Sequence, residues 1–209
     1  MQRYDARTAL VVVDVQNDFA DPAGSLFVAG AAEIIPRINQ AIEAARDAGA
    51  TVVLTQDWHP ASTPHFAKDG GIWPVHCVAK TWGAELHPAV DVPLNAPRIR
   101  KGTNGEDGYS GFSIRDPLTG ETRSTELEAL LRGRGIERVV VCGLATDYCV
   151  NATALDAIAL GFETFFLEDA VAAVNLHPGD DARATKAMLE AGCHPWQIPS
   201  SGAPPAVRS

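Results

Sequence analysis

The sequence predicts an α/β fold, a three-layer α/β/α sandwich around a mostly parallel sheet. Four apolar runs rich in β-branched residues alternate with helical patterns along the 209 residues, at 9–16, 51–57, 138–144 and 163–169. Their apolar character is continuous rather than alternating, which is typical of strands covered on both faces. The alternation of such strands with helices favours a parallel sheet with a layer of helices on each side.

The segment between the first two runs predicts a helix over residues 31–48. Its apolar residues fall on one stripe at helical spacing, formed by Ile34, Ile35, Ile38, Ile42 and Ala45. Gly49 follows as a stop signal, so this helix and its two flanking strands form a βαβ unit. Similar helical patterns separate or follow the later strands, at about 124–133, 147–160 and 179–192.

Residues 58–97 interrupt this alternation. They contain six prolines, three glycines and four of the six histidines, and the segment is too long for an ordinary connection and too apolar for a disordered linker. Loops of this size on a rigid scaffold usually carry function. We expect one domain over residues 1–198 and a flexible C-terminal tail at 199–209, which is rich in Ser, Pro and Ala.

Composition limits the classes of partner. The chain has 17 Lys and Arg against 26 Asp and Glu, a formal charge of −9, which would repel a phosphate backbone or an anionic lipid surface. The start of the chain lacks the pattern of a secretory signal, and no apolar stretch approaches the roughly 20 residues of a membrane span. We expect a cytoplasmic protein that binds neither nucleic acid nor membrane, as a monomer or a homo-oligomer.

Three polar residues are predicted to lie near the carboxyl ends of strands, where open α/β sheets bind ligands. Asp14 lies inside VVVDVQNDF, Lys101 ends the short strand RIRKG, and Cys149 follows the strand at 138–144. An ammonium near the acid and the thiol would favour the ionised forms of both. Taken singly, Asp14 is equally compatible with a turn cap or a structural ion pair, and Lys101 with a solvated surface position.

Cys149 is predicted to lie in the first turn of the helix that follows its strand. Backbone N–H groups and the positive helix end favour a thiolate there, and the same N–H groups can hold a developing oxyanion. The alternative is a buried cysteine that packs as a small apolar residue, which is our interpretation of Cys142 and Cys193. The four cysteines form no CxxC pair, so in a reducing compartment they are expected to be thiols.

A candidate metal cluster comprises Asp57 and His59 together with His65 and His76. In an extended segment residues i and i+2 point to the same side, so Asp57 and His59 can chelate one ion while the loop returns the other two histidines. One carboxylate and several imidazoles suit Zn, Mn or Fe better than Ca or Mg. A lone D-x-H is weak evidence by itself, and Cys77 has no second cysteine at zinc-ligand spacing.

Five motifs, in order along the chain, resemble the nicotinamidase/pyrazinamidase family within the isochorismatase-like cysteine hydrolases. They are DVQNDF at 14–19, TQDWHP at 55–60 followed by His65, WPVHC at 73–77, KG at 101–102 with YSGF at 109–112, and GLATDYCV at 143–150. The resemblance covers essentially the whole chain and implies the isochorismatase-like hydrolase fold. Several ordered motifs together are far more specific than any one of them.

The resemblance also implies roles for individual residues. The family's catalytic Asp, Lys and Cys correspond to Asp14, Lys101 and Cys149. Its metal ligands correspond to Asp57, His59, His65 and His76, and the aromatic residues of its ring pocket to Phe19, Trp73 and Tyr109. It further implies a cis peptide bond at Leu144–Ala145 and an oxyanion hole formed by the backbone N–H groups of Ala145 and Cys149.

The activity implied by the resemblance is that of a nicotinamidase in NAD salvage. Such an enzyme converts nicotinamide, and its ring analogue pyrazinamide, to the carboxylic acid and ammonia through a cysteine thioester. Asp14 would take the proton of Cys149 and return it to the leaving ammonia, while Lys101 would hold Asp14. One divalent transition metal, Zn, Mn or Fe, would position the ring. The sequence leaves open which metal is native and whether it also activates water.

Two alternatives remain at the level of sequence. Another isochorismatase-like amidase could act on a carbamoyl or ureido compound with the same Asp, Lys and Cys, but such relatives generally lack the DxH…H cluster. A noncatalytic binding domain of this fold would be expected to lose the nucleophile or its base, and both are present. The segment GTNGEDG at 102–108, before Tyr109, is variable and leaves that wall of the pocket undetermined.

Overall fold

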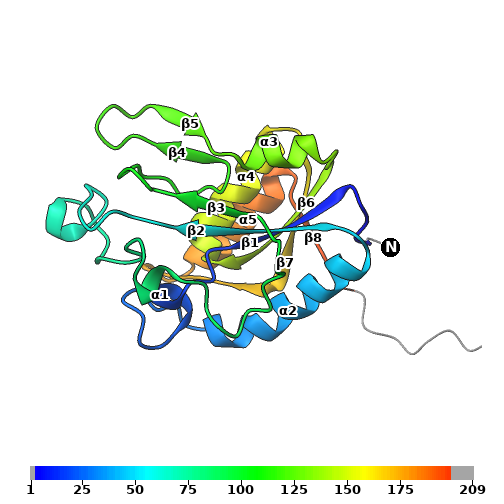
Figure 1. Cartoon of the computed structure of the whole chain (residues 1–209), viewed down its shortest axis with the longest axis horizontal. Helices are drawn as coiled ribbons and strands as arrows, with labels where there is room; N and C mark the ends of the chain where they lie inside the picture. Colours follow the sequence, from blue (N-terminus) through cyan, green and yellow to red (C-terminus); the bar gives the residue numbers. More distant parts are fainter. Residues whose placement is uncertain (1–2, 199–209) are drawn as a thin grey trace, which may run out of the picture.

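A parallel sheet of six strands forms the middle layer of the protein, in a computed structural model that describes residues 3–198 (Figure 1). The strands lie side by side in the order β3-β2-β1-β6-β7-β8. They are β1 (Thr8–Val13), β2 (Thr51–Asp57), β3 (Arg98–Lys101), β6 (Arg138–Leu144), β7 (Glu163–Ala172) and β8 (His194–Pro195). This sheet and the helices on both of its faces confirm the predicted three-layer α/β fold.

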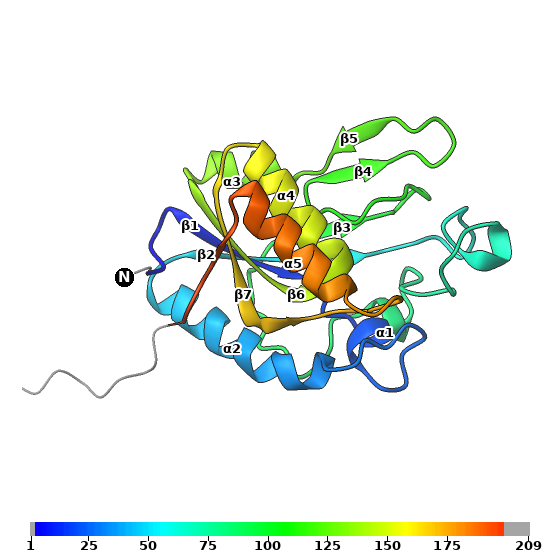
Figure 2. The same cartoon turned by 180° about the vertical axis from the view of Figure 1, so that it is seen from behind.

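Alternate residues of β1 face two separate apolar clusters. Leu10 and Val12 pack with the buried stripe of α2 (Ala31–Asp47), the helix expected at 31–48. Val11 and Val13 pack on the opposite face with residues of three helices. These helices are α3 (Leu127–Gly133), α4 (Asn151–Ala159) and α5 (Asp180–Ala191). Figures 1 and 2 show α2 apart from α4 and α5, so β1 is buried on both sides, as its continuous apolar run predicts.

The strand order reverses beside β1, which pairs with β2 on one side and with β6 on the other. Open α/β sheets bind ligands outside the carboxyl ends of the strands at such a reversal. Gly143 in β6 allows the two central strands to approach, because a Cβ built on it would lie 2.2 Å from the carbonyl oxygen of Val13. The sheet therefore fixes the ends of β1 and β6 close together.

Several boundaries differ from the sequence-based prediction. β1 ends at Val13 rather than at residue 16, because Asp14 adopts a left-handed conformation (φ 50°) that turns the chain. The helix predicted at 147–160 begins as a π-helical turn, Thr146–Val150, and continues as α4. β7 runs three residues beyond the predicted end, to Ala172. These differences lie near the sheet's carboxyl edge, where functional geometry rather than hydrophobic periodicity determines the backbone.

The sequence analysis missed three short strands. The hairpin β4 (Ser113–Arg115) and β5 (Thr122–Ser124) is antiparallel and lies outside the main sheet. The helix expected at about 124–133 begins only at Leu127, and residue 124 belongs to the exposed strand β5. Its segments SIR and TRS carry no apolar run that could predict a strand. The two-residue β8 pairs with β7 and is too short to give a pattern.

The long connection at 58–97 contains two short 3₁₀ turns, Ala67–Asp69 and Trp82–Ala84. A short helix, α1 (Asn17–Ala20), packs near the second turn. Among the described residues, no helix has the length and apolarity needed to cross a bilayer. The division into a domain at 1–198 and a tail at 199–209 stays a prediction, since 199–209 lie outside the described residues.

Replacement of Ile38 by alanine should destabilise the fold. Ile38 is fully buried in the α2 stripe against the sheet, and removal of a buried isoleucine side chain leaves a cavity that the neighbours fill only in part. We expect Ile38→Ala to lower the free energy of unfolding by about 2–5 kcal/mol in urea denaturation. Glu43→Ala, at an exposed position of the same helix, is the control and should change it by less than about 0.5 kcal/mol. Equal values for the two variants would contradict the packing described.

Candidate active site

Four strands deliver one reactive side chain each to the same edge of the sheet. Asp14 follows β1, Asp57 and Lys101 are the last residues of β2 and β3, and Cys149 lies in the π-helical turn after β6. Asp57 and Lys101 are direct partners in the register of β2 and β3. Because parallel strands end at one edge of a sheet, residues far apart in the sequence meet there.

Lys101 lies at the centre of this group, with 1% of the residue exposed. Its Nζ is 2.7 Å from Asp14 Oδ2 and 2.9 Å from Asp57 Oδ1. It also lies 3.5 Å from Cys149 Sγ and 3.1 Å from the carbonyl oxygen of Tyr109. An ammonium has three N–H donors, so this cation is saturated by acceptors and holds two carboxylates in place.

Both oxygens of the Asp14 carboxylate have donors. Lys101 donates to Oδ2, and the Thr55 hydroxyl donates to Oδ1 at 2.5 Å. Thr55 was not predicted as a site residue. The signal that could have identified it is its position in the same strand, two residues before Asp57, so that both side chains face the same side of the sheet.

Burial dominates the protonation of the reactive pair. It raises the pKa of Asp14 above its usual value, against the opposing effect of the Lys101 ammonium. It also raises the pKa of the Cys149 thiol well above its usual value, again against Lys101 and with the Asp14 carboxylate adding to the rise. Cys149 is therefore a thiol at rest, as the expected proton transfer to Asp14 requires; Lys101 lowers the pKa of this thiol as predicted, but burial outweighs that effect. The physical reason is a water-poor site with two carboxylates and one ammonium.

The other two charged groups are ionised. Burial by itself lowers the pKa of Lys101, but the carboxylates of Asp14 and Asp57 outweigh it and raise that pKa well above its usual value. Burial would raise the pKa of Asp57, but Lys101 and then His59 outweigh it and hold that pKa well below its usual range. Of the two carboxylates, Asp14 and Asp57, Asp14 thus has the higher affinity for a proton, as a general base requires.

Three imidazoles converge beside this group. One ring nitrogen of each of His59, His65 and His76 lies within 4.8 Å of the others, and Asp57 Oδ2 lies 3.9 Å from His59 Nε2. Burial lowers the pKa of His59 to about 4 and also lowers that of His76. Neutral imidazoles are the form that binds a metal.

The hydrogen bonds of these histidines fit a metal site. His76 Nδ1 lies 2.7 Å from the carbonyl oxygen of Pro74, and His65 Nδ1 lies 2.9 Å from Asp107 Oδ1, so each has its other ring nitrogen available. Both ring nitrogens of His59 are buried without a hydrogen-bond partner in the described structure, and an unpaired buried nitrogen is unfavourable unless it has a ligand. A ligating histidine typically donates its second N–H to an acceptor, and the contacts of His65 and His76 match this pattern. The set therefore fits a divalent transition metal.

A second group of potential ligand atoms, on Asp14, Asp57 and Cys149, also lies within 4.8 Å. The Lys101 ammonium already lies within hydrogen-bonding distance of all three, so a cation occupies the place that a metal would need. This group is consistent with a nucleophile and its base, and the histidines are the candidate metal ligands.

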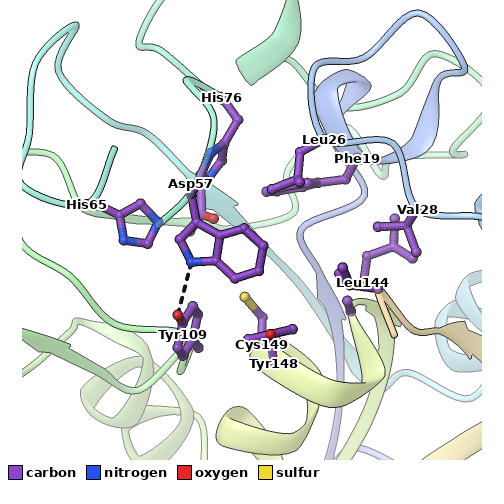
Figure 3. A pocket seen from close by; sticks show the side chains of 13 residues that line it. Phe19, Leu26, Val28, Asp57, His65, His76, Tyr109, Leu144, Tyr148 and Cys149 are labelled. Atoms are coloured by element: carbon purple, nitrogen blue, oxygen red, sulfur yellow. Dashed lines mark hydrogen bonds between the residues drawn. The ribbon is translucent and has the colours of Figure 1, made fainter. Parts of the chain in front are cut away.

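A pocket opens over Cys149, and members of both sets of groups line it, namely Cys149, Asp57, His65 and His76 (Figure 3). The space between its atoms is about 390 Å³, including open space at its mouth. Figure 3 shows Cys149 pointing into it, with Asp57, His65 and His76 across from the sulfur. Asp14, Lys101 and His59 do not line the pocket; they are buried beneath it.

Aromatic rings line the pocket. The predicted ring-binding residues Phe19, Trp73 and Tyr109 all line it, and Trp73 Nε1 donates to the Tyr109 hydroxyl at 3.1 Å. Tyr148 lies edge-on to both, with ring centroids 5.0 Å from Trp73 and 5.2 Å from Tyr109. Ala145 also lines the pocket, after a Leu144–Ala145 bond that is cis, as expected.

Five lining residues were missed by the sequence analysis: Leu26, Val28, Leu144, Tyr148 and Val174. Tyr148 could have been found from its place directly before Cys149. The loop residues Leu26, Val28 and Val174 carry no local signal, because an apolar side chain in a loop is not distinguished by its sequence from one that packs in the core.

Comparison with known proteins places this site among amidases. The isochorismatase domain family matches residues 8–196. The nicotinamidase of Acinetobacter baylyi is 42% identical over 201 residues, which cover 88% of this chain and 89% of that protein. Among solved structures, a pyrazinamidase of Pyrococcus horikoshii in complex with zinc has a TM-score of 0.81 at 43% identity, covering 92% of this chain and 99% of that one.

A structure of PnC1 from L. infantum in complex with nicotinate has a TM-score of 0.84 at 36% identity, covering 94% of this chain and 96% of that one. A relative named for another activity is less similar to this chain than the Acinetobacter baylyi nicotinamidase is. The ureidoacrylate amidohydrolase of Azorhizobium caulinodans is 32% identical and covers 78% of this chain and 75% of its own length. The chain is thus more similar to the proteins named for nicotinamide and pyrazinamide chemistry.

Removal of the buried ammonium should destabilise the protein strongly. Lys101→Met leaves the Asp14 and Asp57 carboxylates buried without their cation, so we expect the free energy of unfolding at pH 7 to fall by about 3–5 kcal/mol. Lys68→Met is the matched control, because Lys68 forms an ion pair of similar length with Asp69, 2.8 Å, at the surface; its loss should cost less than about 1 kcal/mol. Urea denaturation measures both, and similar losses would show that Lys101 does not offset the buried carboxylates.

Proposed function

The chain belongs to the isochorismatase family, and on this basis we propose that it is a nicotinamidase. It hydrolyses nicotinamide, and the ring analogue pyrazinamide, to the carboxylic acid and ammonia, in the salvage of nicotinamide for NAD. The observation that carries the proposal is the joint geometry of one pocket. Cys149, His65 and His76 line it together with aromatic residues, and the buried Lys101 connects Cys149 to Asp14. Sequence similarity to nicotinamidases over most of the chain supports it.

Cys149 is the nucleophile and Asp14 the general base. Asp14 Oδ and Cys149 Sγ lie within 4.8 Å of each other, and the raised pKa of Asp14 lets its carboxylate accept the thiol proton as the sulfur attacks the carboxamide carbon. Asp14 then donates this proton to the leaving ammonia, which leaves a thioester. In the second step Asp14 accepts a proton from water, and the hydroxide that forms attacks the thioester carbon. The C–S bond breaks to release the acid, and Asp14 returns its proton to the departing thiolate, which restores the thiol.

Lys101 does not exchange protons in this scheme. Its raised pKa keeps it an ammonium, and its contacts with Asp14 and Cys149 orient the carboxylate toward the sulfur and stabilise the thiolate as it forms. We assign the oxyanion hole to the backbone N–H groups of Ala145 and Cys149, because both residues lie at the turn after β6 that borders the pocket. A negative charge that develops on the carbonyl oxygen would be stabilised there.

Asp57, His59, His65 and His76 would hold the metal, which when bound supplies a Lewis acid that binds the ring nitrogen of the substrate and fixes its orientation. A site of one carboxylate and three imidazoles suits Zn, Mn and Fe. The protein's own contribution to ring orientation comes from Phe19, Trp73 and Tyr109, whose apolar surfaces fit the faces and edge of a flat heteroaromatic ring.

The lining of the pocket favours a flat apolar ring over the alternative, a carbamoyl or ureido compound. Among the residues described as lining the pocket there is no lysine or arginine, and Leu26, Val28 and Val174 make part of its wall apolar. A neutral aromatic carboxamide matches this lining better.

Replacement of the nucleophile tests the proposal directly. Cys149→Ala should lower ammonia release from nicotinamide by about 1,000-fold or more, because no other group can form the thioester. Cys193→Ala is the matched control, since Cys193 is also a buried thiol but follows α5 and does not line the pocket, and its activity per folded molecule should stay near that of the wild type. Ammonia release by Cys149→Ala at more than a few per cent of the wild-type rate would refute the nucleophile assignment.

The metal ligands can be tested without substrate. His59→Ala should lower the metal content of the purified protein, measured by elemental analysis, from about one divalent ion per chain to a small fraction of that, because a lost imidazole typically weakens a site of this kind severely. His177→Ala, which removes an exposed histidine, should leave the metal content unchanged. If both variants retain the same metal content, His59 is not a ligand.

A further inference from the structure

The segment 102–116 follows Lys101 and includes Tyr109. It carries an acidic residue, Asp107, that the proposed mechanism does not use. Asp107 Oδ1 lies 2.9 Å from Nδ1 of His65. The His65 side chain is buried, with 7% exposed, and the Asp107 side chain is partly covered, with 33% exposed. This contact joins the metal-ligand loop at 58–97 to a separate part of the chain.

The contact determines which nitrogen of His65 is available to a metal. An ionised carboxylate only accepts hydrogen bonds, so the shared proton lies on Nδ1 and leaves the lone pair on Nε2. His76 has the same tautomer for a parallel reason, because its Nδ1 faces the carbonyl oxygen of Pro74.

Asp107 is itself fixed by its backbone. Its N–H donates to the carbonyl oxygen of Arg115 at 2.7 Å, and the Arg115 N–H donates back to the Asp107 carbonyl oxygen at 2.5 Å. The N–H of Gly108 donates to Asp107 Oδ1 at 2.8 Å. Arg115 is the last residue of β4, so backbone hydrogen bonds attach Asp107 to the β4–β5 hairpin.

Two more hydrogen bonds connect the same two segments. The Thr63 hydroxyl donates to the carbonyl oxygen of Gly105 at 3.1 Å, and Trp73 Nε1 donates to the Tyr109 hydroxyl at 3.1 Å. Trp73 and Tyr109 are pocket walls contributed by the two different segments. The contact between His65 and Asp107 is therefore one of three that join the segments carrying these two walls.

We propose that Asp107 is a positioning residue for the metal, which holds His65 in its ligating tautomer and orientation and thereby links metal binding to the order of segment 102–116. This inference rests on the proposed function, because it takes the three histidines as ligands. Outer carboxylates of this kind change metal affinity by about 10–100-fold. The linkage means that metal binding also stabilises the wall that carries Tyr109.

The test measures zinc affinity of the full chain by competition with a chromophoric chelator, without substrate. Asp107→Ala should weaken zinc binding by about 10–100-fold, and Asp107→Asn should weaken it less, because the amide oxygen still accepts the hydrogen bond from His65. Glu106→Gln is the matched control. Glu106 is the neighbouring acid, its carboxylate bonds to Asn104 rather than to a histidine, and its variant should bind zinc as the wild type does.

A second readout tests the linkage. In the wild type, added zinc should slow backbone hydrogen exchange in segment 102–116, and in Asp107→Ala, measured at saturating zinc, this protection should be reduced. Thermal unfolding of the zinc-free proteins shows whether the variant folds, and if Asp107→Ala does not, the comparison of Asp107→Asn with Glu106→Gln takes its place.

The outcomes separate the two proposals. Zinc affinity in the folded Asp107 variant within about twofold of the Glu106→Gln value would overturn the positioning role, while ammonia release from nicotinamide by the wild type would leave the proposed function standing. A wild-type chain that binds no zinc would instead refute the metal-ligand set, and with it the role of Asp107.

Discussion

A single buried ammonium determines how the rest of the site is built. Lys101 is almost completely removed from water, and a buried cation is unfavourable unless carboxylates and further acceptors surround it. Asp14 and Asp57 provide the charges, and Cys149 and the Tyr109 carbonyl complete the shell. Because these groups come from separate elements, the pairing requires the ends of β1, β2 and β3 and the turn after β6 to meet at one point.

The parallel sheet meets this requirement with little adjustment of the backbone. Direct pairing of Asp57 with Lys101 in β2 and β3 places a carboxylate beside the ammonium, and the left-handed turn at Asp14 directs the second carboxylate back to it. Gly143 permits the close approach of β6 to β1, which brings the turn of Cys149 over the same point. The strained or special positions lie where the reactive groups are held, as expected for a site that the fold must preorganise.

Asp57 contacts both the buried ammonium of Lys101 and the histidine cluster, and it also lines the pocket. Its Oδ1 belongs to the ion pair with Lys101, and its Oδ2 faces His59, so the carboxylate that stabilises the ammonium also belongs to the histidine cluster. The cluster in turn borders the aromatic wall through the loop that carries Trp73. A change at the candidate metal ligands would therefore alter the electrostatics beneath Cys149 through Asp57.

The sequence by itself determined the central strands, α2, the three reactive residues and the four candidate ligands, because hydrophobic periodicity and ordered motifs are local properties of the chain. The π-helical turn at Cys149, the β4–β5 hairpin, Thr55 and the apolar wall at Leu26, Val28 and Val174 were decided only by the tertiary structure. So was the resting protonation of Cys149, since its pKa depends on burial and on charges that come from three other strands. The contact between Asp107 and His65 belongs to the same class: it joins residues 42 positions apart, and no pattern within either segment specifies a contact that exists only once the sheet has brought the two loops together.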